Sequence, residues 1–386
     1  MNRLSTSWGG FTLARFPEDP RDTLRAWDAA DEYLLRHLAD EGVDLSGDVV
    51  VLGDRWGALT TSLAAHRPVQ ITDSFLGQEA TRANLARNGL TGPDSGAVRL
   101  LSARDTPPAR IDVLLVRVPK SLGLLEDQLH RLAPALHPGS VIVGTGMVSE
   151  IHTSTLRLFE RIIGPTRTSL AVKKARLIFS TPDPAVERTA GPWPLRYALP
   201  GDVGVVSGRT VTNHSGVFCA DRLDIGTRLF LRSLPERRGA ERVVDLGCGN
   251  GVVGLAAALA NPEASVTFVD ESFSAVASAE ATYRENIPAT GLGGAEFLVG
   301  DGLSGLADGS ADLVLNNPPF HSHRATTDTT ARRMFTGARR VLRPGGELWV
   351  IGNRHLGYHV RLRRLFGSCE VMASDPKFVV LRAVAD

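Results

Sequence analysis

The residues best suited to chemistry form the stretch Asn317-Pro318-Pro319-Phe320, which follows a short apolar run. Two successive prolines cannot donate ladder hydrogen bonds, so they end the strand predicted over 312–315. The Asn317 carbonyl oxygen can accept a hydrogen bond from an NH2 group, and the proline pair stiffens the loop. Phe320 offers a face on which a planar base can stack. The stretch therefore predicts a catalytic site that presents an aromatic amine to an electrophile. We interpret the following His321 as ordering the loop rather than as accepting a proton.

A second candidate site lies in the glycine-rich stretch from Asp245 to Gly251, which follows a predicted strand and opens a predicted helix. Asp245 suits an ammonium group better than a pyrophosphate. Asp270 ends the next predicted strand, where a carboxylate typically binds ribose hydroxyls. Asp301 follows the third, where a carboxylate could accept from an adenine amine. A ligand with an ammonium, a ribose and an adenine but no diphosphate is S-adenosylmethionine, which we expect as cofactor.

Composition sets the broad class of the protein. The chain has 386 residues, 43% apolar and 22% charged, which is typical of a soluble protein with two domains. Its net charge of +1 gives no general preference for nucleic acid, so any basic surface must be local. Three cysteines without paired spacing indicate neither disulfides nor a thiolate metal site. With no signal peptide and no membrane-spanning apolar run, we expect a cytoplasmic protein that contacts no membrane and binds no metal.

Strand-like and helical patterns alternate in both halves of the chain, which predicts parallel sheets covered by helices on both faces. In the first half we expect helices over 17–46, 58–66, 75–88 and 121–135, and strands over 49–52, 69–72, 98–101, 111–116 and 141–143. In the second half we expect strands over 242–245, 265–269, 296–299, 312–315 and 347–351, and helices over 252–260, 273–286 and 326–342. The fold class is therefore α/β, with two tandem Rossmann-like domains.

The two halves also match each other in sequence, which indicates a tandem duplication. Residues 51–57 align with 245–251, 112–115 with 312–315, and 136–139 with 342–345. A proline-rich connection over 181–200 separates the halves, and we place the domains at 1–185 and 186–386.

The first half differs from the second at the positions that would do chemistry. It carries Arg55 where the second half has Gly249, and Arg117 and Lys120 at the ends of the segment that aligns with Asn317–Phe320. A bulky side chain at such a glycine would block a nucleotide. We therefore expect the first half to have lost cofactor binding. Arg117 and Lys120 then either contact RNA phosphates or are simply solvated on a structural domain.

The chain resembles the class I methyltransferases and, more narrowly, the large-subunit branch of the duplicated bacterial rRNA guanine-N2 methyltransferases. The similar stretches are Trp27–Leu35, Asp245–Gly251, Asn317–His321, Ser215–Phe218, Leu223–Phe230, Gly352–Tyr358 and Lys377–Leu381. The resemblance implies methyl transfer from S-adenosylmethionine to the N2 amine of a guanine in ribosomal RNA. Because a fused pair of domains lessens the need for a dimer, we expect a monomer, and we expect no DNA partner. The resemblance also implies a cofactor site made of Thr227, Asp245, Gly247, Cys248, Gly249, Asp270, Asp301, Gly302 and Asn317, and a guanine site made of Asn317, Pro318, Pro319 and Phe320.

Two other functions stay open at this stage. A protein glutamine-N5 methyltransferase uses a similar amide-holding loop, typically with Tyr where this chain has Phe320, and an RNA-binding scaffold could retain a vestigial pocket. Arginines on the predicted helices near the carboxyl terminus are candidate phosphate contacts, although such faces are more often solvated. They are Arg332, Arg333, Arg339, Arg340, Arg343, Arg361, Arg363 and Arg364.

Overall fold

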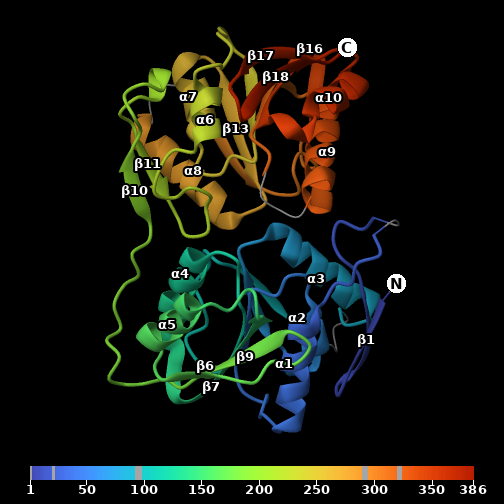
Figure 1. The fold of residues 1–386 in the computed structure, drawn as a ribbon, viewed down its shortest axis with the longest axis vertical. Helices are drawn as coiled ribbons and strands as arrows, with labels where there is room; N and C mark the ends of the chain where they lie inside the picture. The colour runs from blue at the N-terminus through green and yellow to red at the C-terminus, as the bar shows by residue number, and fades with distance from the viewer. Residues whose placement is uncertain (1, 20–21, 92–97, 289–293, 320–323) are drawn as a thin grey trace. The chain divides into compact units, whose positions relative to one another are not determined.

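The computed structural model describes residues 2–19, 22–91, 98–288, 294–319 and 324–386. The chain divides into two compact units, Met1–Pro192 and Trp193–Asp386, drawn in Figure 1. No helix in the described ranges is long and apolar enough to cross a membrane.

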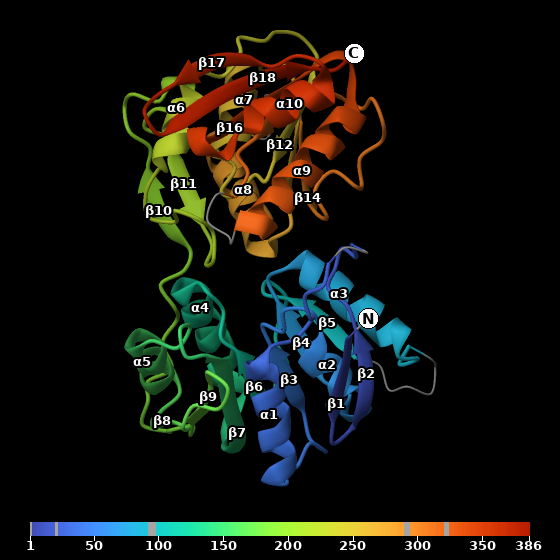
Figure 2. The same cartoon turned by 45° about the vertical axis from the view of Figure 1, so that its right-hand side comes forward.

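The first unit is built around a seven-stranded sheet in the order β5-β4-β3-β6-β7-β9-β8. Neighbours from β5 to β7 are parallel, whereas β9 is antiparallel to both β7 and β8. The strands are β3 (Val49–Leu52), β4 (Val69–Thr72), β5 (Arg99–Ser102), β6 (Ile111–Arg117), β7 (Leu136–Met147), β8 (Thr166–Thr168) and β9 (Ala175–Ser180). Helices α1 (Ala29–Asp40), α2 (Ala58–Ser62) and α3 (Phe75–Arg87) lie on one face, and α4 (Leu122–Leu132) and α5 (Thr153–Ile162) on the other, as Figure 2 shows.

The second unit has the corresponding order, β14-β13-β12-β15-β16-β18-β17. Again the first five strands are parallel and the last two run antiparallel to their neighbours. The strands are β12 (Arg242–Leu246), β13 (Ser265–Asp270), β14 (Ala295–Val299), β15 (Ala311–Asn316), β16 (Leu342–Asn353), β17 (Glu370–Ser374) and β18 (Phe378–Val384). The helices are α6 (Ile225–Leu231), α7 (Val252–Ala260), α8 (Phe273–Asn286), α9 (Arg324–Val341) and α10 (Tyr358–Phe366).

Apolar residues cover both faces of the second sheet, as expected for central parallel strands. In β15, Leu313 and Leu315 pack with α6, α7 and α8, while Val314 packs with α9 and α10. This alternation fixes the register, so that β15 delivers the residues that follow it to the carboxyl edge of the sheet.

All ten predicted strands and the helices between them are present, with two corrections. The sheets are mixed rather than wholly parallel, because β9 and β18 return antiparallel to their neighbours. The predicted helix over 17–46 is wrong beyond its central part, since the first helix covers only Ala29–Asp40. Asp28 caps it: its side chain accepts from the Ala30 N–H, and the Asp31 side chain accepts from the Asp28 N–H.

A β-hairpin precedes each large sheet and packs on a helix through side-chain hydrogen bonds. In the first unit, β1 (Asn2–Thr6) and β2 (Gly9–Leu13) reach α3, where the Asn84 amide bonds both the N–H (2.9 Å) and the C=O (3.0 Å) of Ala14. In the second, β10 (Leu195–Ala198) and β11 (Thr210–Asn213) reach α8, where the Thr282 hydroxyl bonds both backbone groups of Thr212 at 3.1 Å. In both units, therefore, a helix side chain attaches the hairpin by bonding both backbone groups of one residue.

Candidate active site

The loop from Gly247 to Gly251 connects β12 to α7. Gly249 has a φ of +54°, which glycine adopts at little cost, and a Cβ added there would meet no atom within 4 Å. At Gly251 an added Cβ would lie 2.8 Å from the Ala279 Cα on α8, so this glycine lets the two helices approach. The open space beside Gly249 fits a ligand that lies against the backbone.

Asp245 lies near the end of β12 and is buried, with 3% of its surface exposed. Its Oδ2 accepts from the Gly254 N–H at 2.7 Å, which ties the strand to the first turn of α7. Burial, with a smaller contribution from the charge of Asp270, raises the pKa of Asp245 to about 8. The free protein therefore holds this carboxyl mostly protonated at neutral pH, and a bound cation would favour its ionisation.

Asp270 ends β13 and holds the glycine loop in place. Its Oδ2 accepts from the Gly249 N–H and its Oδ1 from the Ser272 N–H, each at 3.0 Å. Burial raises the pKa of Asp270, and these backbone hydrogen bonds oppose the rise. Because a carboxylate has about four acceptor positions, Asp270 keeps capacity for the hydroxyls of a ribose.

Asp301 and Gly302 follow β14 after Gly300. Arg333 of α9 lies with its Nη2 2.5 Å from Asp301 Oδ1, an ion pair that the sequence did not predict. A Cβ added at Gly302 would meet no atom within 4 Å. An adenine amine at this point would therefore share the carboxylate with a guanidinium.

Asn317 follows β15 and meets the amino-terminal turn of α6. Its Nδ2 donates to Thr227 Oγ1 at 3.1 Å, and the Thr227 N–H in turn donates to Asp224 Oδ2 at 3.0 Å, which caps α6. The Asn317 Oδ1 is buried and accepts no hydrogen bond within the described part of the chain. Such an unsatisfied acceptor costs free energy unless a ligand pairs with it. The structure thus brings together Thr227 and Asn317, which lie 90 residues apart in the sequence.

The rest of the predicted loop is described only in part. Pro318 is buried and Pro319 is exposed, whereas Phe320 and His321 lie outside the described residues. Stacking of a base on Phe320 therefore stays a prediction.

Cys248, within the glycine loop, is buried beside Asp270 and Asp245, and burial raises the pKa of its thiol well above the usual range. It stays protonated at neutral pH and is unsuited to act as a nucleophile.

Sequence reasoning missed Asn213, which ends β11 and is fully buried. The Asn250 Nδ2 donates to Asn213 Oδ1 at 3.0 Å, and this bond fastens the β10–β11 hairpin to the glycine loop. The Asn213 Nδ2 has no partner among the described residues. The sequence pattern that could have indicated Asn213 is an asparagine that follows a short strand-like run, as Asn316 does. No strand was expected before Asn213, so the pattern was not recognised.

Two family models match the chain: the RLMG N-terminal domain over residues 1–184 and the methyltransferase small domain over residues 208–382. Ribosomal RNA large subunit methyltransferase G of Streptomyces avermitilis is 74% identical over 381 residues, which cover 99% of this chain and 98% of the relative. The chain belongs to the ribosomal RNA large subunit methyltransferase G family. The relative of the same description in Pseudomonas aeruginosa is 50% identical and covers 99% of this chain and 100% of its own length. The resemblance to the large-subunit branch is confirmed.

A solved structure shares the fold over the whole chain. It is a 16S rRNA N2 methyltransferase of T. thermophilus in complex with AdoMet and guanosine, with a TM-score of 0.75 and 20% identity. The alignment covers 100% of this chain and 98% of that one. The chain has the class I methyltransferase α/β fold.

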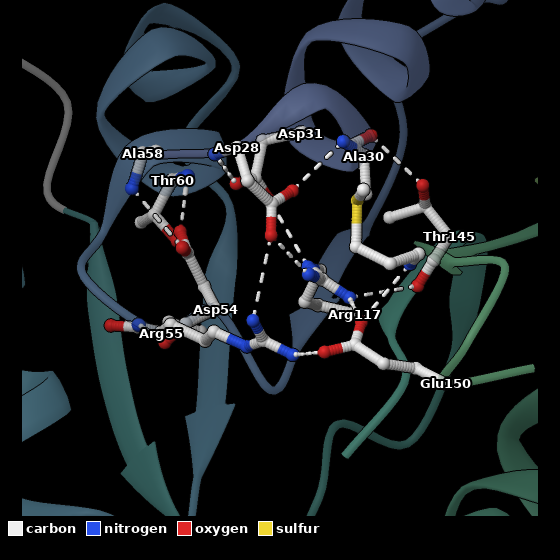
Figure 3. A network of polar contacts seen from close by, with 12 residues as sticks. Asp28, Ala30, Asp31, Asp54, Arg55, Ala58, Thr60, Arg117, Thr145 and Glu150 are labelled. Carbon is white, nitrogen blue, oxygen red and sulfur yellow. Dashed lines mark hydrogen bonds and ion pairs between the residues drawn. The ribbon is translucent and has the colours of Figure 1, made fainter. Parts of the chain in front are cut away.

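The first unit of this family member has a cluster of charged side chains around Arg55 and Arg117, the residues that align with Gly249 and Asn317 of the second unit. Arg117 is fully buried: its Nη2 lies 2.7 Å from Asp28, its Nη1 2.9 Å from Glu150 and its Nε 3.4 Å from Asp31. Arg55 completes the cluster, at 2.6 Å from Glu150 and 3.5 Å from Asp28. Figure 3 shows both guanidinium groups among these three carboxylates.

The position of Arg117 corrects one sequence interpretation. The last residue of β3, Leu52, pairs with Val116, and the last residue of β12, Leu246, pairs with Asn316. Arg117 and Asn317 are the next residues along the chain, so they stand at equivalent places. Arg117 cannot contact RNA phosphates, because no part of its side chain is exposed. Sequence reasoning placed its charge correctly beside a strand end but did not identify the carboxylates that surround it. Lys120 is exposed, so a phosphate contact by this residue stays a prediction.

Several of the arginines near the carboxyl terminus bind within the protein. Arg333 pairs with Asp301, Arg340 Nη2 donates to the Leu303 carbonyl at 2.6 Å, and Arg343 lies 2.6 Å from Asp312. Arg333 and Arg340 belong to α9 and Arg343 to β16, and all three have partners within the protein, whereas Arg332 of α9 is exposed. A phosphate contact by these arginines stays a prediction. Arg363 and Arg364 on α10 are exposed.

Proposed function

We propose that this protein transfers a methyl group from S-adenosylmethionine to the exocyclic N2 amine of a guanine in ribosomal RNA of the large subunit. The observation that carries the proposal is the buried Asn317 Oδ1, an acceptor that has no partner among the described residues. Asn317 follows β15, and its backbone oxygen lies 3.9 Å from the position of a Cβ added at Gly247 in the glycine loop, which supports a shared site. The family to which the chain belongs supports the same reaction.

Each site residue has a role that its contacts support. The Gly247–Gly251 loop and Asp245 would hold the methionine end of the cofactor, with Thr227 toward its carboxylate. Asp270 would hold the ribose and Asp301 the adenine. When bound, the cofactor supplies an electrophilic methyl group. Asn317 Oδ1 and the Pro318 carbonyl would accept the two N–H bonds of the guanine amine, and Phe320 would stack on the base flipped from its RNA helix.

Catalysis in this proposal is orientation of the amine. An NH2 group whose two hydrogens are held by acceptors has its lone pair directed away from them, toward the cofactor side of the loop. Holding reactants in a productive geometry can lower a barrier by about 7 kcal/mol at the low end of intramolecular analogues. The hydrogen bond from Asn317 Nδ2 to Thr227 Oγ1 holds the amide nitrogen, which would leave the amide oxygen for the guanine amine. No protein base is required, because the methylated amine loses its proton after transfer.

We further propose that the two units arose by duplication and that the first has lost its cofactor site. The shared strand order and the shared hairpin docking at Asn84 and Thr282 support a duplication. Arg55 and Arg117, in place of Gly249 and Asn317, support the loss, because their guanidinium groups fill the space.

The test is methylation of ribosomal RNA from a strain that lacks the gene. Purified protein and S-adenosylmethionine with a labelled methyl group are incubated with that RNA, and the RNA is digested to nucleosides. We expect label in N2-methylguanosine and none in a peptide-chain release factor offered as competing substrate. Label in the release factor would favour the glutamine methyltransferase instead. Failure to bind S-adenosylmethionine in calorimetry would favour the scaffold.

The pKa of Asp245 gives a prediction about cofactor binding. Because this pKa is about 8 in the free protein, binding an ammonium group at pH 7 should release close to one proton. Affinity for S-adenosylmethionine should then rise by up to about tenfold from pH 6 to 7 and fall again above about pH 8, where an α-amino group itself loses its proton. Calorimetry in buffers of different ionisation enthalpy measures the released proton directly.

The Asp245→Asn variant is the control for that prediction. It should bind the cofactor more weakly and release no proton. Since the folded pKa is raised, the stability that neutral Asp245 contributes is present below about pH 4 and is lost as the pH rises to about 8. Unfolding temperatures of wild type and Asp245→Asn should therefore diverge over this range, with the wild type losing more. Equal proton release by both proteins would contradict the assignment.

A further inference from the structure

We infer that Asn353 selects guanine as the target base; this inference rests on the proposed methyl transfer to a guanine amine. Asn353 ends β16 and belongs to the stretch Gly352–Tyr358, which the family resemblance includes and which has no part in the transfer proposed above. Its Oδ1 would accept a hydrogen bond from the ring N1–H of the base whose amine Asn317 holds. Asn353 is then a specificity-determining residue of the same site.

The register of the sheet brings Asn353 close to Asn317. Strands β15 and β16 are parallel neighbours, and Asn316 pairs with Val350. The next residue, Asn317, is therefore level with Ile351, two residues before Asn353. At about 3.3 Å per residue, Asn353 lies roughly 7 Å further along the strand direction, at the same carboxyl edge of the sheet.

The Asn353 side chain also lies on the face of the sheet that α6 covers. In β16, Ile351 packs into the core cluster that contains Phe230 of α6. Because side chains alternate along a strand, Asn353 is on the same face as Ile351. Gly352 faces the opposite way, since a Cβ added to it would lie 2.6 Å from a tyrosine ring at the start of α10.

The first turn of α6 borders both asparagines. Asn317 Nδ2 donates to Thr227 Oγ1 at 3.1 Å. Asn353 pairs with Phe378 of the neighbouring strand β18, and the Phe378 ring reaches the residue before Thr227. A Cβ added at Gly226 would lie 3.1 Å from the Phe378 Cε1. Asn317 and Asn353 therefore belong to one site, on the α6 face of the sheet.

The Asn353 side chain has a buried acceptor that nothing local uses. The residue is 7% exposed, and its Oδ1 has no hydrogen-bond partner in the described part of the chain. Asn353 precedes the short 3-10 helix Arg354–Leu356, yet its side chain makes no capping hydrogen bond there. Asn317 Oδ1 is likewise buried and lacks a partner among the described residues. Two such amide oxygens cost free energy, and a ligand with two adjacent donors would satisfy both.

Guanine offers such a pair of donors on its Watson–Crick edge, namely the N2 amine and the adjacent N1–H. In adenine the amine lies next to an N1 that is itself an acceptor. The acceptors that hold the amine could hold either base, because they contact only N–H groups. An added acceptor beside them pairs with guanine N1–H, whereas with adenine it would face a lone pair and stay unsatisfied. Selection therefore includes a penalty against the wrong base.

The test uses a pair of synthetic RNA fragments that span the guanine methylated by the protein. One fragment keeps guanine, and the other carries 2-aminopurine, which has the same C2 amine but an unprotonated N1. We expect the wild type to favour guanine by about 10- to 100-fold in kcat/KM. Asn353→Ala should lose about that factor on guanine and stay within a few fold on 2-aminopurine. Asn353→Asp, which keeps an acceptor oxygen, should retain the preference.

Asn261→Ala is the matched control. Asn261 is also a buried asparagine, but its amide donates to the Gly239 carbonyl at 3.0 Å, before β12 and outside the site. This variant should keep the guanine preference of the wild type. An unchanged preference in Asn353→Ala overturns the inference, as does an equal loss on both fragments, which would show a structural role for Asn353.

Binding of nucleosides tests the selection without methyl transfer. The fluorescence of 2-aminopurine riboside is followed with full-length protein saturated with S-adenosylhomocysteine, and guanosine is added as competitor. The dissociation constant of guanosine should be about 10-fold or more below that of 2-aminopurine riboside for the wild type, and equal to it for Asn353→Ala. Equal constants in the wild type overturn the inference. A wild type that methylates no RNA but still prefers guanosine would contradict the proposed function and leave selection by Asn353 in place.

Discussion

Replacing Asn317 with alanine is expected to reduce kcat for RNA methylation by about 100- to 1000-fold while leaving the affinity for S-adenosylmethionine within a few fold. The variant removes the buried acceptor Oδ1, so one N–H of the guanine amine loses its partner and the amine is free to rotate. Such a loss acts on orientation at the moment of reaction. It should therefore appear in kcat more than in the KM for RNA. Single-turnover transfer of labelled methyl groups measures it.

Asn286→Ala is the matched control for this prediction. The Asn286 amide also makes partly buried hydrogen bonds, donating to the carbonyls of Thr210 and Thr282, each at 2.7 Å, but it lies in the hairpin docking region away from the loop. It should lower the unfolding temperature and leave kcat unchanged at 25 °C. Equal kcat losses in both variants would mean that Asn317 acts through folding rather than through the amine.

Thr227→Val examines how the Asn317 amide is oriented. Valine keeps the shape of threonine but cannot accept from Asn317 Nδ2, so the amide is free to turn its nitrogen toward the substrate amine. We expect an intermediate loss, about fivefold, because a neutral hydrogen bond of this kind is worth about 1 kcal/mol. In the Asn317→Ala background the same change should have no further effect, which a double-mutant cycle on kcat measures.

The strands and the glycine loop were predictable because their signals are local. Runs such as Leu313–Leu315 require burial on both sides, and prolines after Asn317 stop a strand by their chemistry. The acids at strand ends followed from topology, since parallel strands share one carboxyl edge. These rules place Asp245, Asp270 and Asp301 near one another without reference to tertiary contacts.

Contacts between distant segments were beyond local rules. The Asn317–Thr227 bond, the Arg333–Asp301 pair and the Asn250–Asn213 bond each join elements whose mutual approach depends on packing. The hairpins were missed because their strands are only four or five residues long and polar residues or glycines interrupt them, so they lack an apolar run. An arginine read in isolation as a surface charge can equally be the centre of a buried cluster, as Arg117 shows.

Replacing Arg117 with alanine is expected to cost about 3–5 kcal/mol in the free energy of unfolding of the first unit, because it leaves Asp28, Asp31 and Glu150 without their shared cation. Hydrogen exchange of amides in β3 and β6 measures this free energy within the full-length protein. Arg110→Ala is the control. This variant also loses a carboxylate contact, to Asp112 at 2.7 Å, but the Arg110 side chain is 60% exposed. The expected cost in the free energy of unfolding is therefore below about 1 kcal/mol.

The cost of Arg117→Ala should depend on pH in a defined direction. Burial raises the pKa of Asp31 to about 7 even with Arg117 beside it, and removing the cation raises it further. Burial also acts to raise the pKa of Glu150, but Arg117 and Arg55 outweigh it and hold that pKa at about 2. Without Arg117, both carboxyls become costlier to ionise, so the variant recovers stability relative to wild type as the pH falls and protons neutralise them. The difference between the two proteins should be larger at pH 8 than at pH 5. A stability difference between wild type and Arg117→Ala that does not change with pH would show that Arg117 acts by packing alone. A stability loss as small as that of Arg110→Ala would show that the cluster does not depend on the charge of Arg117.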